Sequence, residues 1–200
     1  MVHVVSSSAF AKKAEAAGCD AVVAEGFEAG GHNGREETTT MVLVPAVKNA
    51  VAIPVIAAGG IATGRQMLAS MVLGGEAVQI GSRFVCSHEA SSHIYFKNEV
   101  VAAGEGATML SMKPAMPVRL LKNKLYETLK AAEERGATKE ELLAILGKGR
   151  AKKGMFEGQL DEGELEIGQA SSLINSIEPA GEIVNEIWRD FNLALEHPLI

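Results

Sequence analysis

The stretch that most constrains this chain is a short apolar run, residues 21–24, that passes directly into a glycine-rich loop, residues 25–34. Glycine permits positive φ angles and lets the backbone come close to a ligand. His32, at the tip of the loop, is its one titratable ring and can exchange a proton near neutral pH. Such a loop after a buried strand is typical of a catalytic loop in a barrel, although a tight turn with a solvated histidine has the same pattern.

Two further apolar runs end in glycine. Residues 54–58 lead into a Gly-Gly pair, and residues 77–80 lead into a Gly-Ser pair. Between them, residues 63–73 have a capping-box start and predict a helix. The order strand, loop, helix, strand, loop predicts an α/β fold with a parallel sheet. Glycine loops at the ends of adjacent parallel strands predict a phosphate cradle of backbone N–H groups.

The rest of the chain is predicted to be mainly helical. Helices are predicted over residues 8–17, 38–50, 88–103, 118–135, 138–146 and 181–195, with loop or extended backbone over 104–117. The basic segment 147–154 lacks the order of a P-loop; it is either a solvated loop or a contact for a phosphate-bearing partner. The acidic run 161–166 is predicted to be a solvated face at the start of a helix, although paired carboxylates also occur at acid–base and cation sites.

Charge and composition disfavour several classes of function. The net charge is −6 and the isoelectric point is near 5.4, whereas a nucleic-acid-binding protein needs a basic face. No apolar run reaches the ~18 residues of a membrane helix, and the N-terminus has no signal-peptide pattern, so we expect a cytoplasmic location. Cys19 and Cys86 are predicted to be core residues. His88 and His93 lack the spacing of metal ligands on one helix face.

Several sequences in these regions resemble a known family. AEGFEAGGHNG at 24–34, PVIAAGGIATG at 54–64 and AVQIGSRF at 77–84 resemble the nitronate monooxygenase (2-nitropropane dioxygenase) superfamily of flavoproteins. Within that superfamily, VRLLKNKLYE at 118–127 and DEGELEIGQASSLI at 161–174 make the chain most similar to the FMN-dependent enoyl-acyl-carrier-protein reductases II.

The resemblance implies the C-terminal half of a TIM (β/α)₈ barrel followed by a helical segment. The implied barrel strands 5–8 are residues 3–5, 21–25, 54–58 and 77–81. Residues 1–87 would form the flavin-binding half-barrel, and residues 88–200 would form a C-terminal helical region that packs on it. The open sheet edges of a half-barrel invite association, so a homo-oligomer is expected.

The resemblance also implies a site. FMN would be the cofactor and NAD(P)H the co-substrate. The residues implied to contact FMN are Glu25, Gly30, Gly31, Ala58, Gly59, Gly60, Gln79, Gly81 and Ser82. His32 would polarise the carbonyl of a trans-2-enoyl thioester on acyl carrier protein, or supply a proton to it.

Two alternatives remain open. In a nitronate monooxygenase, His32 would remove the α-proton of a nitroalkane, and O₂ would oxidise the reduced flavin. One histidine over one flavin serves either reaction, so the motif does not separate them. In the second alternative the chain is an inactive half-barrel that pairs with another chain. No metal site is expected in any of these cases.

Overall fold

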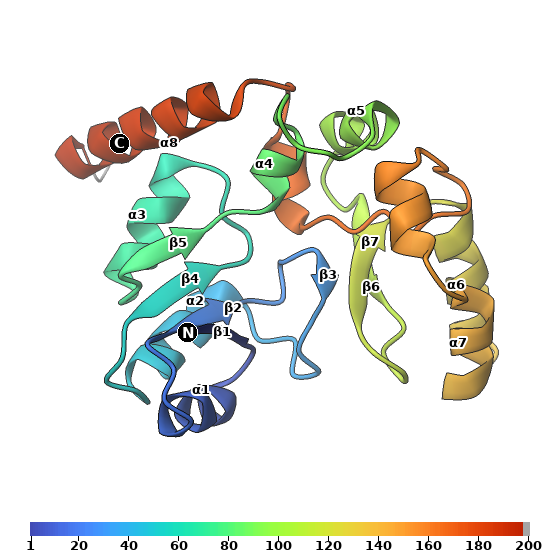
Figure 1. Cartoon of the computed structure of the whole chain (residues 1–200), viewed down its shortest axis with the longest axis horizontal. Helices are drawn as coiled ribbons and strands as arrows, with labels where there is room; N and C mark the ends of the chain where they lie inside the picture. The colour runs from blue at the N-terminus through green and yellow to red at the C-terminus, as the bar shows by residue number, and fades with distance from the viewer. Residues whose placement is uncertain (198–200) are drawn as a thin grey trace.

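The computed structural model describes residues 1–197. Four parallel strands form one sheet in the order β1-β2-β4-β5 (Figure 1). They are β1 (Val2–Val5), β2 (Ala21–Glu25), β4 (Val55–Ala58) and β5 (Ala77–Gln79). Between successive strands run helices α1 (Ser8–Ala16), α2 (Thr40–Lys48) and α3 (Gly64–Val72). The predicted α/β fold with a parallel sheet is therefore confirmed.

Local capping chemistry starts two of these helices. The Ser7 side chain accepts a hydrogen bond from a backbone N–H in the first turn of α1. Thr63 and Gln66 form a reciprocal capping box at the start of α3. The helices cover the sheet, and the apolar residues of strands and helices share one core. Its buried members include Val22, Ala24, Val44, Val47 and Val55.

A second, antiparallel sheet has the order β3-β7-β6. Its strands are β3 (Gly31–His32), β6 (Thr108–Ser111) and β7 (Val118–Leu121). The predicted helix over 118–135 is wrong at its start, because residues 118–121 are a fully buried strand and α6 (Lys124–Glu134) begins only after Asn123. The Asn123 side chain accepts the Tyr126 N–H and so marks the true helix start.

Shorter elements surround this second sheet. They are α4 (Ser82–Val85), α5 (Ile94–Ala102), α7 (Lys139–Leu146), a π-helical turn (Lys152–Phe156) and a 3₁₀ helix (Gln169–Leu173). The helix predicted over 88–103 begins only at Ile94, because the His93 side chain caps it there. The segment predicted as a basic loop, 147–154, runs into the π-helical turn.

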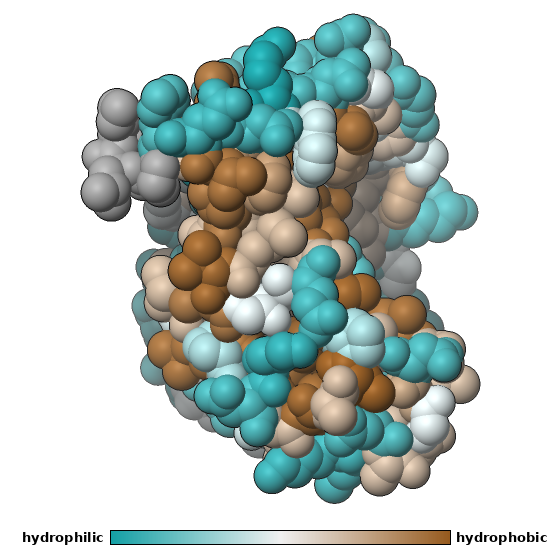
Figure 2. Space-filling view, turned by 90° about the vertical axis from the view of Figure 1, so that its left-hand side faces the viewer, coloured by the Kyte–Doolittle hydropathy of each residue, from teal (hydrophilic) through white to brown (hydrophobic). Residues whose placement is uncertain are grey.

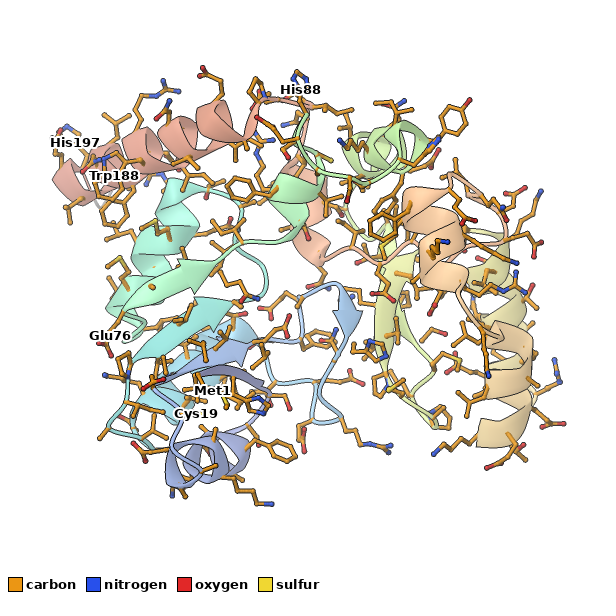
Figure 3. The ribbon with its side chains drawn as sticks, viewed as in Figure 1. Met1, Cys19, Glu76, His88, Trp188 and His197 are labelled. Atoms are coloured by element: carbon orange, nitrogen blue, oxygen red, sulfur yellow. The ribbon has the colours of Figure 1, made fainter. Side chains whose placement is uncertain are left out.

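The last helix, α8 (Ala180–Glu196), packs across α3 at very short range. A Cβ on Gly64 would lie 2.0 Å from the Phe191 nitrogen, so only glycine fits at this crossing. Trp188, which lies on α8 in Figure 3, stacks on Phe191 with a ring separation of 5.4 Å. None of the helices within residues 1–197 is long and apolar enough to cross a membrane.

A buried arginine joins the two sheets. Arg119, on β7, is only 2% exposed. Its Nε and Nη2 donate to the Phe27 carbonyl oxygen at 3.1 and 2.9 Å, and its guanidinium lies 4.6 Å from the centre of the Phe27 ring. Because Phe27 belongs to the loop that leaves β2 and carries His32, this contact ties that loop to β7 of the antiparallel sheet. Strands β3 and β7 pair with each other, although β3 comes before residue 87 and β7 comes after it. The division of the chain into two domains at residue 87 therefore stays a prediction.

The parallel sheet ends in two edges. Within residues 1–197, β1 pairs only with β2, and β5 pairs only with β4. Val2 and Val4 of β1 are exposed. Figure 2 shows apolar side chains gathered on the side of the molecule that carries α3 and the end of α8. Parallel strands are normally paired on both sides and covered, so these edges are surfaces that another segment could complete.

We expect the chain to associate in solution, because a desolvated backbone group without a partner costs roughly 1–3 kcal/mol. Light scattering over a dilution series would measure the mass, and Val4→Lys, which puts a charge on the β1 edge, should shift it toward that of the monomer. Leu143→Lys, at an exposed position of α7 away from both sheet edges, is the control. A constant mass of 21.0 kDa for the unmodified chain would contradict the expectation.

Candidate functional site

The carboxyl ends of β2, β4 and β5 meet at a cavity of about 210 Å³. Because the strands are parallel, their ends come together at one edge of the sheet. Eight residues predicted to contact a cofactor line the cavity: Glu25, Gly30, Ala58, Gly59, Gly60, Gln79, Gly81 and Ser82. The lining residues that sequence reasoning missed are Glu28, Ala29, Ile61, Val85, Met155, Glu166, Ile167 and Ala170.

Two glycine loops leave backbone donors free at this cavity. Gly59 and Gly60 have φ angles of +91° and +71°, and a Cβ on Gly59 would lie 2.7 Å from the Gly26 carbonyl oxygen. Glycine alone adopts this backbone without strain. Within residues 1–197, several N–H groups of the two loops have no hydrogen-bond acceptor, among them those of Gly60, Ile61, Gly81 and Ser82. Free N–H groups on neighbouring loops suit the oxygens of a phosphate.

A segment from much later in the chain, residues 166–170, closes the cavity. The Gly168 N–H donates to Ser82 Oγ at 3.0 Å, and the N–H of the following residue donates to the Glu28 carbonyl oxygen at 2.9 Å. A Cβ on Gly30 would lie 2.4 Å from the carbonyl carbon of Ile167, so the two backbones touch directly. In Figure 1 this segment is the orange strip between β7 and α4.

The acidic run 161–166 corrects a prediction. It is not a solvated helix start: its first residues form a turn, and its end pairs with β7. The Leu121 N–H donates to the Leu165 carbonyl oxygen at 2.9 Å. Glu164 is buried and Glu166 is half-buried. β3 pairs only with Val118 and Arg119 of β7, which leaves Leu120 and Leu121 free on that side, and the pairing of this later segment with them folds the charged run inward.

Carboxylates are the only charged groups among the cavity-lining residues that the structure describes. The Glu28 carboxylate accepts the Thr40 N–H and hydroxyl, each at 3.0 Å. For Glu25 and Glu166, no side-chain hydrogen bond or ion pair is found within residues 1–197. Burial raises the pKa of both of these carboxyls, and in Glu166 the charge of His32 opposes the rise. A phosphate here would therefore be held by backbone N–H groups rather than by a cationic side chain.

His32 lies outside this cavity. It lines a neighbouring cavity of about 290 Å³, at the ends of β1 and β2, together with Ser6, Asn33 and Glu25. We call the two loops at Gly59-Gly60 and Gly81-Ser82 the glycine cradle. Glu25 lines both cavities and therefore lies between this cradle and His32, the predicted acid–base residue. Gly31, also predicted at the cofactor, has a φ of +76° and does not line the first cavity. A Cβ on it would lie 2.7 Å from Glu166 Oε2.

The other histidines and the cysteines lie elsewhere. His88 and His197 lie at opposite ends of α8 (Figure 3), and His93 caps α5. Cys19 and Cys86 are buried, as predicted, and burial raises the pKa of the Cys86 thiol to about 11. Among residues 1–197 there is no group of three or more His, Cys, Asp or Glu side chains placed to hold a metal ion.

Comparison with known proteins gives a consistent picture. The family model of nitronate monooxygenase matches residues 1–190. A probable nitronate monooxygenase of Staphylococcus saprophyticus is 32% identical over 190 residues, which are 86% of this chain and 54% of that protein.

Solved structures resemble the chain over almost its whole length. FabK from Thermotoga maritima matches with a TM-score of 0.91 at 39% identity. The match covers 98% of this chain and 61% of the FabK chain. The nitroalkane oxidase from Streptomyces ansochromogenes matches with a TM-score of 0.79 at 29% identity. The match covers 98% of this chain and 58% of the oxidase chain. The chain thus spans only a little more than half the length of these proteins.

The buried acidic residue Glu164 makes stability depend on pH. Burial raises its pKa to about 7, the charge of Glu166 adds to the rise, and Arg150 opposes it. The unfolded chain loses this proton at the ordinary glutamate pKa, whereas the folded chain holds it. The free energy of unfolding therefore falls as pH rises from that ordinary value to about 7, and changes no further above it.

Glu164→Gln removes this titration. We expect the variant to be more stable than the parent at pH 8, by about 3 kcal/mol at most, with the difference shrinking as pH is lowered toward 5. Urea unfolding at several pH values measures it, and Glu140→Gln, at an exposed position of α7, is the control. A stability difference that does not vary with pH would show that Glu164 is not the group responsible.

Proposed function

The chain belongs to the nitronate monooxygenase family, and on that basis we propose that it acts in an FMN-dependent oxidoreductase that reduces a trans-2-enoyl thioester with NAD(P)H. The observation that carries the proposal is the pair of glycine loops with free N–H groups in one cavity. The similarity to FabK, over 98% of this chain, favours the reductase within the family. Acyl carrier protein is the expected carrier of the thioester.

The cavity fits the phosphate end of FMN. Gly59, Gly60, Gly81 and Ser82 offer backbone donors, and a Cβ at Gly60 would intrude on the space beside Glu28, 3.3 Å away. Glu25 and Gln79 would be polar neighbours of the ring. When bound, FMN would supply hydride transfer between NAD(P)H and the substrate.

The role proposed for His32 is to donate a hydrogen bond or a proton to the thioester carbonyl. Its cavity adjoins the cradle through Glu25, so a ligand that occupies both cavities could meet the backbone donors at one end and the imidazole at the other. The similarity to the nitroalkane oxidase keeps a second candidate function, in which His32 removes the α-proton of a nitroalkane.

We also propose that the four parallel strands are barrel strands 5–8, whose edges at β1 and β5 are completed by further strands. A second copy of this chain is the proposed source of that cover. If no such cover forms, the remaining candidate is an inactive half-barrel.

Flavin retention tests the cradle. Gly60→Val puts a β-branched side chain at a φ of +71°, beside Glu28 and in the path of a phosphate, and should abolish flavin binding. Gly136→Val is the matched control, because Gly136 has a φ of +79° and open space around it, so the backbone strain is similar without any contact with the cavity. Absorbance of the bound flavin is the measurement. Equal flavin content in the two variants would rule out this placement of the phosphate.

Turnover tests the reaction. NAD(P)H consumption with a crotonyl thioester and O₂ uptake with a nitroalkane should be compared for the parent, His32→Ala and the control His88→Ala. The reductase proposal predicts that thioester turnover exceeds nitroalkane turnover, and that His32→Ala keeps its flavin but loses ~10²–10⁴-fold in rate. Faster nitroalkane turnover would favour the monooxygenase. Parent-like rates in His32→Ala would leave His32 as a turn residue only.

A further inference from the structure

Glu166 lies between the histidine loop and the cavity of the candidate site. It forms an antiparallel bridge with Leu120 of β7, and Gly31 pairs with the preceding residue, Arg119. Glu166 and the histidine loop are thus neighbours along β7. The Oε2 of Glu166 would lie 2.7 Å from a Cβ on Gly31. The same side chain lines the cavity that holds the glycine cradle, whereas His32 does not.

The Glu166 carboxyl has no structural partner. The structure describes no hydrogen bond or ion pair for it within residues 1–197, although other acidic residues of the chain are engaged: Glu28 binds Thr40, and Glu178 binds Arg83. A half-buried carboxyl that stabilises nothing in the fold loses solvation without compensation. Such a cost is typical of groups kept for a reaction.

Two of the neighbouring acids do not take its place. Glu28 is held by Thr40, and Glu164 does not line the cavity. Glu25 lines both cavities and lies at the end of β2, beside His32 in the second one. His32 and Glu164 interact electrostatically with Glu166, and Glu25 and Glu28 line the same cavity. Burial raises the pKa of Glu166, which favours its protonated, proton-donating form.

We propose that Glu166 is a catalytic acid of this site, which donates the proton that the α-carbon of the enoyl thioester takes up; this rests on the proposed reductase function. The bound cofactor, when reduced, would supply a hydride to the β-carbon, and the π electrons of the double bond would move to the α-carbon. A new C–H bond forms there with the proton of Glu166, and its O–H bond breaks. Solvent then returns a proton to the carboxylate, while His32 polarises the carbonyl from the adjoining cavity.

The test separates the two half-reactions in Glu166→Gln. Reduction of the flavin by NAD(P)H should match the parent, whereas reoxidation by a crotonyl thioester should slow by ~10²–10⁴-fold. In the parent, reoxidation should fall as pH rises through the pKa of the acid, and this dependence should vanish in the variant. Glu166→Asp, which keeps the carboxyl, should recover part of the rate. Glu162→Gln, in the same run but exposed and paired with Arg150, is the control.

A measurement that needs no bound cofactor distinguishes a failure of this proposal from a failure of the proposed function. Carbon-13 NMR of the glutamate carboxyls in the chain as purified should show resonances of Glu25, Glu164 and Glu166 that titrate above the ordinary glutamate range, and one of them should be missing in Glu166→Gln. If that resonance is present but no preparation reduces a thioester, the proposed function fails and the proton-donor role fails with it. If reoxidation is unchanged in Glu166→Gln, or Glu166 titrates in the ordinary range, Glu166 is not the acid.

Discussion

The contact between Arg119 and the carbonyl of Phe27 holds the two sheets of this chain together. A guanidinium so deeply buried loses most of its hydration, which lowers its pKa, and no carboxylate pairs with it within the part of the chain described here. Two hydrogen bonds to one carbonyl and the stacking on the Phe27 ring compensate for that loss. The planar fork of arginine is what allows both donors to reach the same oxygen, so lysine could not replace it.

The cavity depends on this contact, because its walls come from both sheets. The ends of β2, β4 and β5 supply the glycine loops, and the segment after Glu164 supplies the opposite wall. The two walls touch through the backbones of Gly30 and Ile167, where a Cβ would meet atoms 2.4 Å away. A side chain at this point would separate the walls and open the cavity to water.

The electrostatics of the cavity combine two kinds of group. Backbone N–H donors attract an anion without adding a full charge, and the half-buried carboxyls of Glu25 and Glu166 can hold protons. This combination fits a cofactor held by its phosphate next to a reaction that moves protons. The proposed reductase and monooxygenase reactions would both need a phosphate-anchored flavin and a proton carrier, so the cavity alone does not separate the two proposals.

The sequence by itself determined the parallel sheet and the glycine loops at the carboxyl ends of its strands. Both arise from local signals: apolar runs that end in glycine, and the capping box of Thr63 and Gln66. Only the tertiary structure decided that residues 118–121 form a strand, because their leucines fit a helical period and are strand residues only when buried between neighbours. It likewise decided that His32 and the cradle occupy adjoining cavities, and that Glu166 faces the cradle. These placements depend on the pairing of β7 with segments distant in sequence, which no local pattern of residues encodes.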